Sequence, residues 1–150
     1  MRIYEFKNEE KEREDLLQYL KTVDWGAGKH LHEVISNNAV KEELGKDGRI
    51  FYAVDQDRIM GFFTIVNQDY IKLPEYDRFI AMVWVDPAFR GRGFSKDFIA
   101  HAEEQSGVDS MHILTQHKGL YEKMDYKLVD VFTDSIHDKD YLYEKNLRQA

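Results

Sequence analysis

The sequence has no cysteine and only two prolines in a chain of 150 residues. Without thiols, the chain cannot form a disulfide, a thiolate metal site or a cysteine nucleophile. It has no apolar run near the length of about 20 residues that a helix needs to cross a bilayer. Its N-terminus is charged from Arg2 onward, unlike a signal peptide. We therefore expect a cytoplasmic protein that makes no contact with a membrane.

Positive charge is also scarce, because 21 lysines and arginines stand against 28 aspartates and glutamates, for a formal net charge of −7. This balance argues against a general nucleic-acid binder and favours a cationic substrate such as an amine. The six histidines show no ligand spacing with carboxylates, so we expect no metal. A hydrophobic content of 43% is ordinary for a globular protein, and the length predicts one domain over residues 1–150.

One stretch of the sequence organises the rest of the chain. The apolar run 79–85 is typical of a strand buried on both faces, and Asp86-Pro87 ends it. Arg90-Gly91-Arg92-Gly93 follows and leads directly into Phe94 and Ser95, where a helix pattern begins. The free N–H groups of such a turn and the positive end of the helix dipole form an anion site, suited to phosphate or pyrophosphate.

The remaining segments predict a mixed α/β sheet with helices on both faces. A short strand around Ile3 precedes a helix that Asn8 is expected to cap, and a second helix is expected to end near Leu44-Gly45. A hairpin and the central strand come next. The other expected elements are strands at 49–54, 58–66, 111–114, 126–132 and 141–147, a helix at 94–106 that stops at Gly107, and a short helix at 119–124.

The central stretch resembles the acyl-CoA-binding signature of the GNAT-family N-acetyltransferases, V-x-P-x-x-[QR]-x-x-G-x-[GA]. The matching residues are Val85, Pro87, Arg90 and Gly93, with Ser95 in place of the final small residue. The resemblance implies the GNAT fold, a mostly antiparallel sheet splayed at its fourth and fifth strands with a bulge. It also implies an enzyme that transfers an acetyl group from acetyl-CoA to a small-molecule or peptide amine by direct attack.

The same resemblance assigns the cofactor-binding residues. The pyrophosphate would lie on the turn, and the pantetheine amides would pair with backbone groups of the splayed fourth strand. These positions are Val83, Val85, Arg90, Gly91, Arg92, Gly93, Phe94 and Ser95.

A second segment, Tyr121 to Tyr126, resembles the family element Y-x-K-x-G-[FY]. In many members this tyrosine protonates the departing CoA thiolate, and Tyr121 matches it. A phenol is a competent acid towards a thiolate. Asp125 stands where the family has glycine. If this position is left-handed, aspartate tolerates it better than most residues but less well than glycine.

The general base stays open at this stage. Some members use a glutamate on the fourth strand, but residues 80–82 are apolar here. His117, Glu75, Asp77 and a water chain are alternatives. A rival interpretation is therefore a non-catalytic acyl-CoA-binding domain, and a weaker one is a nucleotide-binding domain. Family members are often dimers, and Tyr141 and Tyr143 are candidates for a partner surface.

Overall fold

The computed structural model describes residues 1–133 and 138–148, so His137 and part of the loop predicted between the last two strands lie outside the described residues. The described strands form one sheet in the order β1-β2-β3-β4-β5-β7-β6. Neighbouring strands are antiparallel except β4 and β5, which are parallel. This confirms the mixed, mostly antiparallel sheet. The bounds are β1 Arg2–Glu5, β2 Arg49–Asp55, β3 Arg58–Val66, β4 Phe79–Val85, β5 Ser110–Thr115, β6 Lys127–Phe132 and β7 Asp140–Asn146.

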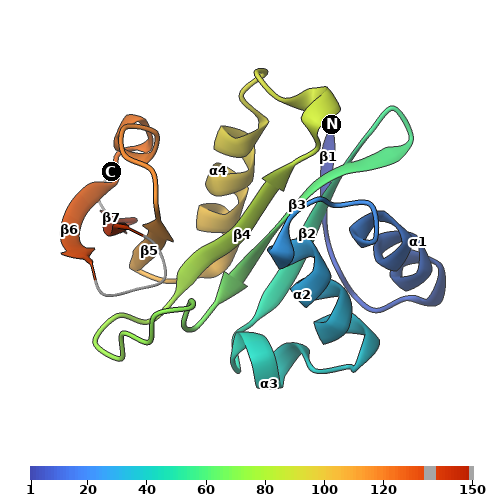
Figure 1. Cartoon of the computed structure of the whole chain (residues 1–150), viewed down its shortest axis with the longest axis horizontal. Helices are drawn as coiled ribbons and strands as arrows, with labels where there is room; N and C mark the ends of the chain where they lie inside the picture. The colour runs from blue at the N-terminus through green and yellow to red at the C-terminus, as the bar shows by residue number, and fades with distance from the viewer. Residues whose placement is uncertain (134–137, 149–150) are drawn as a thin grey trace.

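Helices cover both faces of this sheet, as predicted (Figure 1). On one face, α1 (Glu10–Leu20), α2 (Gly26–Ser36) and α3 (Val40–Leu44) bury residues such as Leu16 and Leu31 against the sheet. On the other face, α4 (Phe94–Ser106) buries Phe98 and Ile99 against β2, β3 and β5. The apolar stripes of the helices on the two faces therefore pack into two separate core clusters. This packing places α4 directly behind β4.

Two helix boundaries differ from the sequence prediction. Asn8 does not cap α1, because it adopts a left-handed conformation (φ 61°) and Glu9 takes the cap position. There the Glu12 carboxylate accepts the Glu9 N–H at 3.3 Å. The predicted second helix is two helices, α2 and α3, because the chain turns between them at Asn38, which has φ 52°. Asparagine tolerates this conformation better than most residues, so a short break was possible without glycine.

The sheet opens between β4 and β5. Phe79 and His112 form the one bridge pair recorded between these strands in the described chain. On its other side, β4 carries a bulge: Phe62 pairs with Trp84 and Thr64 with Ala81, so that two β4 residues face Phe63 alone. One of them, Met82, has φ 53°, a conformation that is rare for a bulky residue. A bulge increases the local twist, and here it accompanies the divergence of β4 from β5 (Figure 1).

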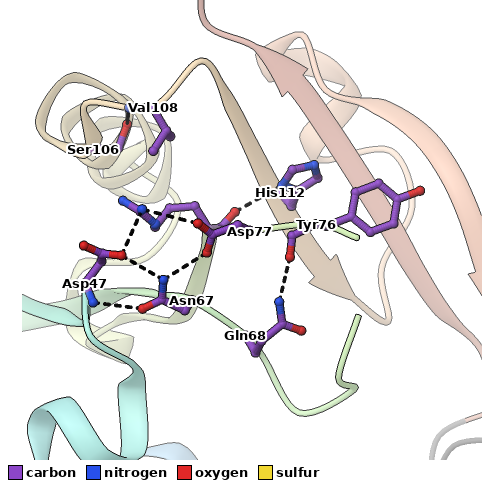
Figure 2. Close-up of polar contacts among 9 residues, drawn as sticks. Asp47, Asn67, Gln68, Tyr76, Asp77, Ser106, Val108 and His112 are labelled. Atoms are coloured by element: carbon purple, nitrogen blue, oxygen red, sulfur yellow. Dashed lines mark hydrogen bonds and ion pairs between the residues drawn. The ribbon is translucent and has the colours of Figure 1, made fainter. Parts of the chain in front are cut away.

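A polar network holds the start of β4 at the point where the two strands still meet. Figure 2 shows Asp47, Asn67 and Asp77 pointing towards one another. Asn67 Nδ2 donates to Asp47 at 3.0 Å and to Asp77 at 2.9 Å, and the Arg78 guanidinium reaches Asp47 at 3.1 Å. The carbonyl oxygen of Arg78 then accepts the backbone N–H of His112 at 3.2 Å. This network fixes the end of β4 from which the splay begins.

Candidate active site

The predicted anion site is a turn built at the open end of β4. Asp86 follows the strand, and its carboxylate accepts the Ala88 N–H at 3.0 Å, which closes a 3₁₀ turn at Pro87–Phe89. Gly91 and Gly93 come next with φ values of 81° and 80°. Glycine adopts this left-handed backbone without the steric cost that a Cβ brings, so the two glycines let the chain reverse into α4.

Backbone donors converge where this turn meets α4. The first intrahelical bond runs from the Asp97 N–H to the Gly93 oxygen at 3.4 Å. The N–H groups of the three preceding residues, Phe94, Ser95 and Lys96, therefore have no place in the helix ladder. A Cβ built on Gly91 or Gly93 would meet no atom within 4 Å, so the backbone there is open to a ligand. This arrangement can hold an anion.

Arg90 and Arg92 add positive charge to the turn, and both lie on its exposed surface. Neither forms an ion pair with a carboxylate in the part of the chain that the structure describes. The Arg90 guanidinium lies 4.7 Å from the centre of the Trp84 ring, and that of Arg92 lies 5.6 Å from the centre of the Phe89 ring. Their charges therefore remain available to an anion on a protein that is acidic as a whole.

The backbone of β4 beyond the bulge has one side without a neighbouring strand. Because the Asp86 N–H donates to the Met60 oxygen on β3, strand alternation directs the polar groups of Val85 the other way, towards the opening. Arg90 Nε donates to the Val85 oxygen from that side at 2.8 Å. Val85 is therefore oriented as its predicted role requires, but its carbonyl already accepts a hydrogen bond from within the chain.

A cavity of about 910 Å³ extends from this opening across the sheet. Its walls come from the bulged segment of β4, the end of β5, the start of α2 and the loop between β3 and β4. Val83 and Tyr121 line it, whereas the other predicted cofactor residues lie outside, along Val85 and the exposed turn. The predicted site residues therefore form two groups, one that lines the cavity and one on the surface at the turn. β4 connects the two groups.

Tyr121 begins a short 3₁₀ helix, Tyr121–Met124, that follows β5. Its ring packs against Tyr126 and Tyr143, with ring centres 6.3 and 6.1 Å away. Its hydroxyl has no hydrogen-bond partner among the described residues. Burial raises the pKa of this phenol, so it stays protonated at neutral pH and can act as a proton donor. Asp125 ends the turn in a left-handed conformation (φ 71°), as expected for a residue at the family's glycine position.

Of the side chains that the sequence analysis named as candidate general bases, one lines the cavity and two do not. His117 lines the cavity as an exposed residue, whereas Glu75 and Asp77 are exposed residues that do not line it. The sequence analysis missed Asp69, a half-buried carboxylate on the β3–β4 loop that does line the cavity. Burial raises the pKa of this carboxyl to about 6. No local pattern marks a lone loop aspartate, since its burial comes from distant segments.

The predicted partner surface is only partly compatible with the structure. Tyr143 is fully buried and donates to Glu122 at 2.8 Å, so its proposed role on a partner surface is wrong; Tyr141 is partly buried. Its place in the last strand had suggested exposure, but its ring packs near Tyr121 and its hydroxyl bonds Glu122, both on the short helix after β5. Within residues 1–133 and 138–148, no group of three or more metal-ligating side chains could hold an ion. No helix in this part of the chain is long and apolar enough to span a bilayer.

Comparisons with known proteins agree with this geometry. Residues 46–128, more than half of the chain, match the family model of the acetyltransferase (GNAT) domain. The match begins just before β2, ends at the start of β6 and includes both the turn and Tyr121. A search of curated proteins finds no significant match to the sequence.

Solved structures resemble the fold over its full length. An aminoglycoside 6'-N-acetyltransferase complexed with coenzyme A is 18% identical with a TM-score of 0.70, covering 100% of this chain and 99% of that one. The aminoglycoside 6'-N-acetyltransferase from Enterococcus faecium is 20% identical with a TM-score of 0.71 and the same coverage. An N-acetyltransferase from Staphylococcus aureus Mu50 is 14% identical with a TM-score of 0.69, covering 99% of this chain and 100% of that one. The fold is shared with these proteins, and with the family match it shows that this chain belongs to the GNAT family of acetyltransferases.

Proposed function

We propose that this acetyltransferase transfers the acetyl group of acetyl-CoA to a primary amine by direct attack, with Tyr121 as the general acid. Acetyl-CoA supplies the activated acetyl thioester. The observation that carries the proposal is the position of Tyr121, which lines the same cavity as the bulged segment of β4 and whose hydroxyl has no partner in the described chain. A donor in that position can protonate a leaving thiolate.

The surface end of the site fits the phosphates of the co-substrate. The turn offers unpaired N–H groups from Phe94, Ser95 and Lys96, the N-terminus of a 13-residue helix, and two arginines without carboxylate partners among the described residues. The polar groups of Val83 and Val85 would pair with the pantetheine amides. The Val85 oxygen already accepts a hydrogen bond from Arg90, so its N–H and the second lone pair of its oxygen are the groups left for this pairing. A backbone N–H on this strand would also polarise the thioester carbonyl.

The acceptor is a primary amine in a small molecule or a peptide. Two of the similar structures are aminoglycoside acetyltransferases, whose substrates are cationic, and the formal charge of −7 on this chain favours a cation as well. We further propose that the protein acts in the cytoplasm as a single domain. A homodimer, which the family resemblance implies, stays a prediction, and Tyr143 is not part of its surface.

Replacing Tyr121 by phenylalanine tests the mechanism, because it removes one hydroxyl and keeps the packed ring. The turnover number should fall about 10²–10⁴-fold, the usual effect of a general acid, while acetyl-CoA affinity barely changes. Release of free thiol from acetyl-CoA with a panel of amines measures turnover, and calorimetry measures affinity.

Tyr126→Phe is the matched control, because Tyr126 is a buried neighbouring tyrosine whose hydroxyl bonds Glu103 at 2.7 Å, outside the cavity. This variant should lose stability and keep its turnover number. A drop of less than about threefold in Tyr121→Phe would remove Tyr121 from the mechanism. Binding of acetyl-CoA without thiol release from any amine would favour the non-catalytic alternative, and equal binding of ATP would favour a nucleotide-binding domain.

A further inference from the structure

Carboxylates outnumber lysines and arginines on the walls of the cavity. Three carboxylates line it, against one lysine. Asp24 and Glu43 are exposed, whereas Asp69 is half-buried and therefore meets a bound molecule under the least screening by water. The titratable groups that share the cavity with Asp69 are Asp24, His30, Glu43, Tyr70, Lys72, His117 and Tyr121, and Asp140 on β7 adds a neighbouring negative charge.

The loop that carries Asp69 is braced by its own hydrogen bonds. Gln68 donates to the Tyr76 carbonyl at 2.6 Å (Figure 2). It also accepts the Leu73 N–H at 2.5 Å. Lys72 Nζ donates to the backbone oxygen of Asp69 at 3.2 Å, which leaves the carboxylate free of this lysine's hydrogen bond. The position of Asp69 is thus set before any ligand arrives.

The two oxygens of the Asp69 carboxylate have different surroundings. Oδ1 accepts the Tyr70 N–H at 2.8 Å. Oδ2 accepts no hydrogen bond from the described part of the chain and is not sealed from solvent. A carboxylate on a cavity wall that is oriented through one oxygen and keeps the other without a hydrogen bond is suited to accept a proton.

We propose that Asp69 is the general base: its carboxylate binds the ammonium group of the acceptor in the cavity and removes one proton before the amine attacks. This assignment rests on the proposed function and names the base that the sequence left open. An acceptor with a negative charge next to its amine would be repelled by Asp69 and Asp140, so the preferred class is an amine without an adjacent carboxylate.

Every proton in this scheme has a destination. One proton passes from the ammonium nitrogen to Asp69 and leaves to solvent after turnover. The freed lone pair forms the new C–N bond and the C–S bond breaks. Tyr121 delivers its proton to the departing sulfur, and the second proton lost by the nitrogen restores the Tyr121 hydroxyl. The products are the amide, the CoA thiol and one H⁺.

The raised pKa of Asp69 suits this role. A carboxyl with a pKa of about 6 is a better proton acceptor than an ordinary aspartate, yet it remains largely ionised at pH 7. Because the ionised form is the active one, kcat/KM should be constant above about pH 7 and fall as the pH drops through about 6. The pH profile of the unmodified enzyme with ethylamine reports this directly, since ethylamine stays an ammonium ion throughout that range.

Asp69→Asn is the decisive variant, because the amide keeps the size of the side chain and can still accept the Tyr70 N–H. Two acceptors are compared at pH 7, ethylamine, which arrives protonated, and trifluoroethylamine, which is largely neutral. Turnover of ethylamine should fall at least about 10²-fold, and that of trifluoroethylamine by less than about threefold. Acetyl-CoA affinity by calorimetry should not change. Glu75→Gln, an exposed carboxylate on the same loop and outside the cavity, should behave as the unmodified enzyme.

The possible results distinguish a failure of the proposed base from a failure of the proposed function. An equal loss with both amines would make Asp69 structural, and no loss would exclude it as the base, while the acetyltransferase function would stand in either case. If neither ethylamine, trifluoroethylamine nor an aminoglycoside were acetylated by the unmodified enzyme, the proposed function would fall and the base with it. Should Asp69→Asn lose acetyl-CoA binding through misfolding, the pH profile decides, because a profile without a limb near pH 6 overturns the assignment.

Discussion

At the scale of single residues, the proposed phosphate-binding turn at 90–95 depends on a hydroxyl that lies far from it in sequence. Tyr19 on α1 donates to Asp86 at 3.0 Å and accepts the indole N–H of Trp84 at 3.0 Å. Asp86 uses its other oxygen to close the 3₁₀ turn before the glycines. One phenol therefore connects α1, the last part of β4 and the beginning of the turn.

Tyr19→Phe should loosen this connection. The change removes the partner of a half-buried indole N–H, and we expect unfolding free energy to fall by about 1 kcal/mol. Acetyl-CoA affinity should also fall, because Asp86 loses one of the contacts that orient the turn. Denaturant unfolding and calorimetry measure the two effects.

Tyr52→Phe is its control, since Tyr52 also connects α1 to the sheet, through Glu12 at 2.6 Å, but away from the turn. It should lose comparable stability and keep its acetyl-CoA affinity. If both variants bound acetyl-CoA equally well, Tyr19 would have no part in shaping the turn.

Sequence reasoning at this scale succeeds where backbone conformation is local. Asp125 is left-handed, and the family's glycine at the matching position had raised this conformation as a possibility. Asp69 and Tyr143 depend instead on how remote segments pack. Asp69 lies on a loop that shares a cavity with β5, α2 and α3, and Tyr143 belongs to a core cluster built from several distant elements. Neither could be inferred from neighbouring residues.

At the scale of elements, α4 is bounded by two glycines of nearly the same conformation. Gly93 begins it with φ 80° and Gly107 ends it with φ 69°, and an added Cβ would be unobstructed at both. They differ in what surrounds them, because Gly93 lies in the turn with the free N–H groups whereas Gly107 lies at the opposite end of the helix.

This symmetry allows backbone strain to be separated from ligand binding. Gly93→Ala and Gly107→Ala should each lower stability by about 1 kcal/mol, since alanine is strained in a left-handed conformation. Only Gly93→Ala should also weaken acetyl-CoA binding, because its methyl group would stand in the proposed path of the phosphates to the backbone. Thermal unfolding measures the stability of each variant, and calorimetry measures its acetyl-CoA affinity. Equal affinities in the two variants would contradict a phosphate site at this turn.

Elements with strong local signals were predicted correctly. The bounds of β4 and α4 follow from an apolar run ended by Asp86-Pro87 and from a helix pattern ended by Gly107. The division into α2 and α3 was missed because an apolar helix pattern continues across Asn38, and an asparagine gives a weaker stop signal than glycine. The bulge at Met82 also has no local signal, because it is a matter of pairing with β3.

At the scale of the whole molecule, the sheet consists of two parts. β1 to β4 form one and β5, β7 and β6 the other, with the Phe79–His112 bridge between them (Figure 1). Side-chain packing also crosses this boundary, because α4 buries Phe98 against residues of both parts. Side-chain packing and one end of β4 thus connect two sets of strands that elsewhere hydrogen-bond only within themselves in the described chain.

Such a sheet need not open as a single cooperative unit. Native-state hydrogen exchange should resolve two classes of amides, with those of β5, β6 and β7 exposed by openings of lower free energy than those of β2 and β3. Acetyl-CoA should raise protection most in the β5 class, because a ligand held between β4 and β5 ties the two sets of strands together. A single opening energy across all strands, unchanged by acetyl-CoA, would contradict this. If the two classes of amides are found, the opening between β4 and β5 is also the boundary between two foldons. Acetyl-CoA is then the ligand that makes their unfolding cooperative.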